Sequence, residues 1–127
     1  MRIVTSCLAL ILIAAAFPAL AADPPSATAA ICRSIEKNQC EGSGTKFSSD
    51  VGKLYGFSVM TNVPDKIFHV WFYKDKELGR FEVRAPNAPR WKAFSNVTVA
   101  RNMPGVWRFE VRDASNTVLA SVSVTLQ

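Results

Sequence analysis

The chain has 127 residues, of which 49% are hydrophobic, and its 15 basic and 10 acidic residues give a formal net charge of +5. This length suits a single domain, and beyond the N-terminus no run approaches the ~20 apolar residues that a membrane-spanning helix needs. The basic excess is modest and spread along the chain, which favours contact with anionic polymers and argues against nucleic acid as the partner.

The N-terminus is typical of a secretory signal peptide. Arg2 supplies the positive charge, residues 7–20 are almost uninterruptedly apolar, and Ala19-Leu20-Ala21 offers small residues at the spacing that signal peptidase reads. We expect residues 1–21 to be removed, with cleavage after Ala21. The remaining chain is then periplasmic or secreted and has no membrane span.

Removal of the signal peptide leaves two cysteines, Cys32 and Cys40. In an oxidising compartment they are expected to form a disulfide, whose short loop contributes about 2–3 kcal/mol. A reactive thiol is the alternative, although redox pairs are more often spaced Cys-x-x-Cys. Two thiols and one distant histidine do not make a metal site, so we expect no metal and no cofactor.

Residues 22–30 are small and contain two prolines, which predicts a flexible or extended lead-in before a domain at 31–127. Short runs rich in β-formers then alternate with turn residues, and no segment keeps a helical period for three turns. The predicted strands lie near 31–36, 51–60, 67–74, 77–84, 91–100, 105–113 and 117–126. This pattern predicts an all-β fold, a seven-stranded immunoglobulin-like antiparallel β-sandwich, with a small barrel as the alternative.

Alternation along each strand assigns its two faces. In the strand near 105–113 the core residues are predicted to be Trp107, Phe109 and Val111. In the last strand they are predicted to be Val118, Ala120, Val122, Val124 and Leu126. Glutamates 82 and 110 alternate with arginines and are expected to form cross-strand ion pairs on a solvated sheet face.

The strand near 67–74 is apolar on both faces, which is typical of a central strand. One face carries His69, Trp71 and Tyr73, whose polar atoms favour contact with solvent or a ligand. The alternative is a buried group with the imidazole hydrogen-bonded inside the core. The sequence leaves both interpretations open.

A candidate ligand platform combines these side chains with the Arg90-Trp91-Lys92 segment. Aromatic rings stack on the apolar faces of sugars, and the neighbouring cations bind hydroxyls or anions. The predicted ligand-binding residues are His69, Trp71, Tyr73, Arg90, Trp91 and Lys92. A structural cation–π pair between Arg90 and Trp91 is the alternative for those two residues.

Three segments carry a family resemblance. His-Val-Trp-Phe-Tyr at 69–73, Pro-Arg-Trp-Lys-Ala-Phe-Ser at 89–95 and Pro-Gly-Val-Trp-Arg-Phe-Glu-Val-Arg-Asp at 104–113 resemble the bacterial domain of unknown function 2914. The resemblance extends over roughly Ile31 to Leu126, although Asn96 stands where many members carry lysine. It implies a compact β domain in exported or membrane-bound proteins, and it implies no activity.

Catalysis is not expected. His69 is the only histidine and has no visible nucleophilic partner in the sequence, and the acids are too scattered to indicate a carboxylate pair. We therefore expect a non-catalytic exported binding module for a glycan or an anionic cell-envelope polymer. The alternatives are a protein-interaction domain that pairs with another envelope protein through a sheet edge or a basic face, and an enzyme whose groups converge only in three dimensions.

Overall fold

The structure, a computed structural model, describes residues 23–127, and every regular element in that range is a β-strand. The strands are β1 (Ser26–Cys32), β2 (Ser34–Glu36), β3 (Gln39–Glu41), β4 (Lys46–Phe47), β5 (Lys53–Thr61), β6 (Lys66–Tyr73), β7 (Lys76–Arg84), β8 (Arg90–Thr98), β9 (Gly105–Asp113) and β10 (Val118–Leu126). In this range no helix is long and apolar enough to cross a membrane. The predicted signal peptide and its cleavage site after Ala21 lie outside the described residues.

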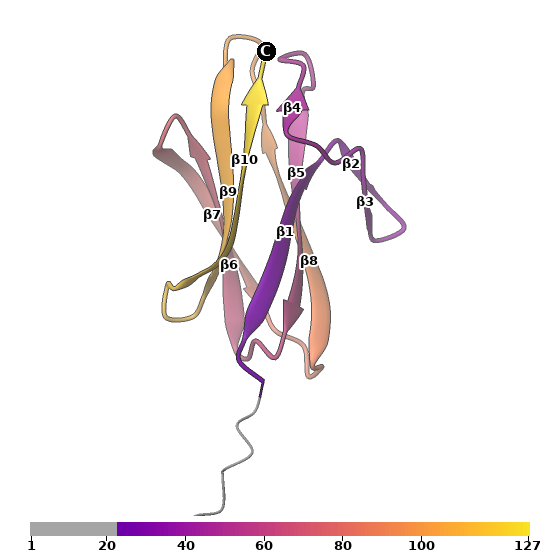
Figure 1. Cartoon of the computed structure of the whole chain (residues 1–127), viewed down its shortest axis with the longest axis vertical. Helices are drawn as coiled ribbons and strands as arrows, with labels where there is room; N and C mark the ends of the chain where they lie inside the picture. Colours follow the sequence, from indigo (N-terminus) through magenta and orange to yellow (C-terminus); the bar gives the residue numbers. More distant parts are fainter. Residues whose placement is uncertain (1–22) are drawn as a thin grey trace, which may run out of the picture.

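The strands form three open sheets. One has the order β1-β5-β8, a larger one has the order β4-β10-β9-β6-β7, and β2 pairs with β3. All pairings are antiparallel except that of β4 with β10. Figure 1 shows the two larger sheets as two layers, with the β2–β3 hairpin projecting from one side. The all-β prediction is confirmed, with ten strands rather than seven.

The predicted strands from residue 51 onward correspond to β5–β10, whereas the region before them differs. The predicted domain boundary at residue 31 is too late, because residues 26–30 are extended and belong to β1, which pairs with β5. Small side chains here form a strand because backbone pairing, rather than a hydrophobic pattern, defines it. The predicted strand at 31–36 is divided at Arg33 between β1 and β2.

The core lies between the two larger sheets and contains the predicted Trp107, Phe109 and Val111. In β10, Val124 and Leu126 are buried as predicted, but Val118 is 47% exposed. A β-bulge between Val118 and Ala120 shifts the register with β9, so the alternation that holds for the rest of the strand breaks there.

The two sheets approach closely at Gly56 in β5. A Cβ atom at this position would lie 2.7 Å from ring atoms of Phe109 and Trp71, so both rings rest on the bare backbone of the facing sheet. β6, which carries Trp71, pairs with β7 on one side and β9 on the other. Its predicted central position is confirmed.

The predicted disulfide joins Cys32 to Cys40, with 5.6 Å between the two Cα atoms. It links the end of β1 to β3 and so fastens the β2–β3 hairpin to the three-stranded sheet. The hairpin turn itself uses Lys37 and Asn38, both with positive φ.

Candidate functional site

His69 and Trp71 lie in the interior, and neither exposes any surface. The expectation that their face of β6 reaches solvent or a ligand is wrong. This face is turned toward β5 and β8, whose side chains cover it. The ring of Phe109, in the neighbouring strand, is perpendicular to the imidazole, with 4.7 Å between the two ring centres. The buried alternative is the correct one.

The His69 imidazole joins the two sheets through hydrogen bonds. Its Nε2 lies 2.7 Å from Ser58 Oγ in β5, and its Nδ1 lies 2.8 Å from Ser95 Oγ in β8. Ser95 Oγ also accepts a hydrogen bond from the indole N–H of Trp71, at 3.0 Å. The two serine hydroxyls can each donate or accept, so they can bond the neutral imidazole in either tautomer.

Burial favours the neutral imidazole, and desolvation lowers the pKa of His69 from 6.5 to about 4. No buried side-chain nitrogen or oxygen in residues 23–127 lacks a hydrogen-bond partner. A Ser–His contact of this kind can activate a nucleophile when a substrate reaches it. Here Ser58, His69 and Ser95 are all buried. The network therefore stabilises the fold.

The remaining predicted site residues do not converge with His69. Trp91 is buried and its indole N–H donates to the carbonyl of Val63, while Tyr73 is half-buried and its hydroxyl donates to the carbonyl of Pro104. Arg90 and Lys92 are exposed. They flank Trp91 in β8 and therefore point to the opposite side of the sheet.

The outward side of the three-stranded sheet gathers a different set of side chains, which we name the aromatic–basic face. Phe94 is 52% exposed, and it is paired in register with Phe57. The Lys92 ammonium lies 6.0 Å from the centre of the Phe57 ring. The members of the face are Lys53, Tyr55, Phe57, Arg90, Lys92 and Phe94.

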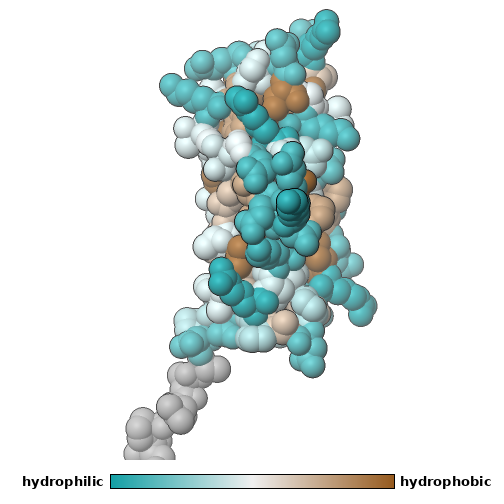
Figure 2. Space-filling model, turned by 90° about the vertical axis from the view of Figure 1, so that its right-hand side faces the viewer, coloured by the Kyte–Doolittle hydropathy of each residue, from teal (hydrophilic) through white to brown (hydrophobic). Residues whose placement is uncertain are grey.

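The charge on this face has no internal counterpart, because β1, β5 and β8 contain no aspartate or glutamate. The sequence did not lead us to predict Tyr55, Phe57 and Phe94 as site residues, because the predicted platform was built on tryptophan, histidine and Tyr73. The signal was present: in β8 the alternation that buries Trp91 also exposes Phe94 beside Lys92. Figure 2 views the molecule from the side of the hairpin and β8, and there hydrophobic patches lie interspersed with hydrophilic side chains.

Comparison with protein families gives one match, to the family described as Protein of unknown function (DUF2914), over residues 64–126. This part of the chain belongs to the DUF2914 family. The match is shorter than the resemblance expected from the sequence, which extended back to Ile31. A comparison with curated proteins gave no match.

The DUF2914 segment contains β6–β10, and so it provides most of the larger sheet and the outer strand, β8, of the smaller one. The aromatic–basic face is therefore composite. Arg90, Lys92 and Phe94 lie within the DUF2914 segment, whereas Tyr55 and Phe57 come from β5, outside it.

The outward side of the larger sheet is also aromatic and basic, but most of its cations are paired with carboxylates. Arg108 lies 4.1 Å from the centre of the Phe72 ring, and Glu110, buried between two arginines, bonds Arg108 at 3.1 Å and Arg112 at 3.0 Å. Glu82 pairs with Lys66. The cross-strand ion pair predicted for Glu82 is confirmed. For Glu110 the prediction is wrong in two respects: its carboxylate is buried, and both of its arginine partners lie in its own strand, β9.

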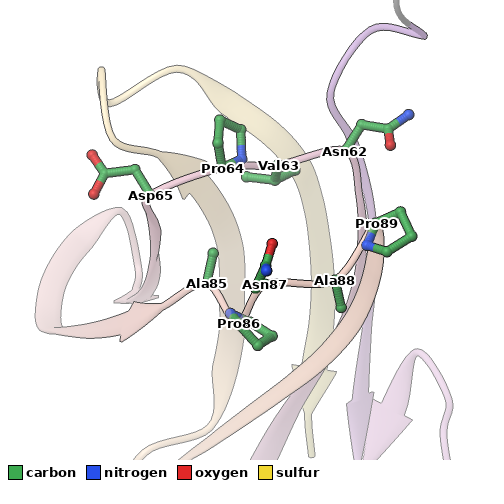
Figure 3. A pocket seen from close by; sticks show the side chains of 9 residues that line it. All are labelled: Asn62, Val63, Pro64, Asp65, Ala85, Pro86, Asn87, Ala88 and Pro89. Atoms are coloured by element: carbon green, nitrogen blue, oxygen red, sulfur yellow. The ribbon is translucent and has the colours of Figure 1, made fainter.

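A hollow lies between the β5–β6 and β7–β8 loops (Figure 3). Its lining is mostly proline, alanine and asparagine, and Asp65, its one titratable residue, points away from the opposite loop. No set of polar groups converges in it. The aromatic–basic face is therefore the stronger candidate site.

Proposed function

We propose that this protein is an exported, non-catalytic binding module that holds an anionic polysaccharide of the cell envelope on its aromatic–basic face. The observation that carries the proposal is the combination of three outward aromatic rings and three cations on strands that contain no carboxylate. Such a surface offers stacking area and positive charge together.

Each part of the face has a physical role. Phe57 and Phe94 lie side by side across β5 and β8, which gives an area on which the apolar face of a sugar ring can stack. Arg90 and Lys92 stand on the same strand edge and bind carboxylate or phosphate groups of the polymer. Because no carboxylate of these strands competes for the cations, they are available to a ligand.

The architecture supports a binding role in an oxidising compartment. We take the two facing sheets to be an immunoglobulin-like β-sandwich extended by the β2–β3 hairpin and β4. The Cys32–Cys40 disulfide supports export. The only histidine is sealed in the core, which leaves the surface without the usual general base and supports a non-catalytic role.

Titration calorimetry with polygalacturonate, and with a neutral glucan as comparison, tests the proposal. Arg90→Ala together with Lys92→Ala should weaken polygalacturonate binding by about tenfold or more, because charge-assisted contacts are lost. The matched control is Lys46→Ala with Lys76→Ala, two exposed cations in the edge strands of the larger sheet, which should change binding by less than about twofold. If the two double variants weaken binding equally, the binding depends only on the net charge of the protein, and the proposal is wrong.

A second candidate function is protein interaction through a sheet edge. It is favoured by a separate observation, the free outer edge of β8.

A further inference from the structure

The edge strand β8 presents unpaired backbone groups along its whole length. Two backbone hydrogen bonds show which residues of β8 bond to β5. Asn62 N–H donates to Pro89 O at 2.7 Å, and Val99 N–H donates to Gly52 O at 2.8 Å. Because bonded and non-bonded positions alternate in an antiparallel pair, odd-numbered residues of β8 face β5. The N–H and C=O groups of the even-numbered residues therefore point to the open edge, and those residues are Arg90, Lys92, Phe94, Asn96 and Thr98.

The other edges of the two larger sheets are covered, short or irregular. β1 contacts β10 and β9 of the facing sheet, β4 is two residues long, and β7 has a register shift opposite Trp71 and Phe72. Short edges, bulges and charged side chains are the usual protections against strand addition. β8 has nine residues, no proline and an unbroken register with β5.

The larger sheet extends past β8 and leaves an uncovered apolar shelf. His69 in β6 reaches both Ser58 and Ser95, so β6 lies over β5 and β8, and β7 lies one strand further out, at the margin of the molecule (Figure 1). Phe81 of β7 pairs in register with His69 and shares its inward face. It is nevertheless 42% exposed, because no strand of the smaller sheet lies beneath it.

One more strand beside β8, at the usual spacing of about 4.8 Å, would bond the free backbone groups and cover Phe81 at once. We propose that an extended segment of a partner protein adds to β8 as this strand. Its alternate side chains are apolar, toward Phe81, and acidic, toward Arg90 and Lys92. This site goes beyond polymer binding, because its main contacts are with the backbone of the edge rather than with the aromatic rings.

A second copy of this chain fits the edge less well. Pairing of β8 with itself about Phe94 would align Lys92 with Asn96 and create no like-charge contact. However, the twofold axis would bring the projecting β7 strands of both copies into the same space above the joined edges. A single strand has no such obstacle.

The experiment uses a set of labelled ten-residue synthetic peptides with alternating valine or isoleucine and aspartate or glutamate, titrated into the full chain by fluorescence anisotropy. Asn96→Pro removes an edge N–H that does not bond β5, and Asn96→Ala is the matched control that keeps it. Asn96→Pro should weaken binding by about tenfold or more, and Asn96→Ala by less than about twofold. Melting temperatures of the two variants verify that both are folded.

A second readout locates the bound strand. Hydrogen exchange should show new protection of the amides of Lys92, Phe94 and Asn96 on peptide binding, and Phe81→Ser should weaken binding while polygalacturonate affinity is retained. Equal binding by the two Asn96 variants, or no binding by any peptide at about 1 mM, would overturn the proposal. A dimer that Asn96→Pro dissociates would also overturn it, in favour of a second copy as the occupant.

Discussion

The two outward sheet faces are built from similar side chains and yet differ in what their charges contact. On the larger sheet, Arg108 and Arg112 cover Phe72 and are held by the buried carboxylate of Glu110. On the smaller sheet, Phe94 lies open beside Lys92, and the strands supply no carboxylate. The cations of the larger sheet are paired within that sheet and contribute to stability. The aromatic rings and cations of the smaller sheet stay available to a ligand.

Removal of an aromatic ring from each face should give the largest difference in stability between them. Phe72→Ala should lower the free energy of unfolding by about 3 kcal/mol, because the ring is buried beneath two guanidinium groups. Phe94→Ala should lower it by less than about 1 kcal/mol, since half of that ring is already in water. Urea unfolding of the two variants makes the comparison, and similar losses would mean that the faces do not differ in this way.

The fold could be predicted from the sequence further than the site. Alternation and turn residues were enough to place β5–β10 and the core residues Trp107, Phe109 and Val111. They could not tell which side of β6 faces the core, because both of its sides are apolar and only the facing sheet decides. β1 was missed for a different reason: its pairing with β5 depends on backbone hydrogen bonds, which leave little trace in a run of alanine, serine and threonine.

Burial of the predicted tryptophan and histidine contacts has a related physical reason. Their polar atoms find partners inside the protein: Ser58 and Ser95 for His69, and the carbonyl of Val63 for Trp91. Arg90 and Lys92, which were predicted to bind a ligand, are exposed, whereas their aromatic neighbours were not recognised. Cross-strand register, which pairs Phe94 with Phe57, depends on the distant strand β5 and is not visible in either segment alone.

Acid should destabilise the contact between the two sheets, because His69 links them through its hydrogen bonds to Ser58 and Ser95. In the unfolded chain this imidazole takes up a proton near pH 6.5, whereas in the folded protein it does so only near pH 4. Protonation therefore favours the unfolded chain: stability is complete above pH 6.5 and falls by about 3 kcal/mol as the pH drops to 4. Chemical unfolding at several pH values measures this loss.

The control for the acid effect is His69→Gln, which keeps a neutral hydrogen-bonding side chain without a titration in this range. Its stability should vary little between pH 6.5 and 4.5. Glu82, whose pKa is lowered chiefly by its hydrogen bond to Lys66, loses its contribution only as the pH falls below its ordinary value of 4.5, so the two windows are separable. An unchanged slope in His69→Gln would assign the loss to other groups.

The smallest effects should come from single charges, and they sharpen the contrast between the faces most directly. Glu110→Gln should cost about 1–2 kcal/mol of stability, because Arg108 and Arg112 lose the carboxylate that holds them over Phe72. Lys92→Gln should change stability by less than about 0.5 kcal/mol, since no carboxylate of its sheet pairs with it. If thermal unfolding shows that Lys92→Gln is as costly as Glu110→Gln, then Lys92 is engaged within the fold, and the aromatic–basic face is not the free surface on which polymer binding depends.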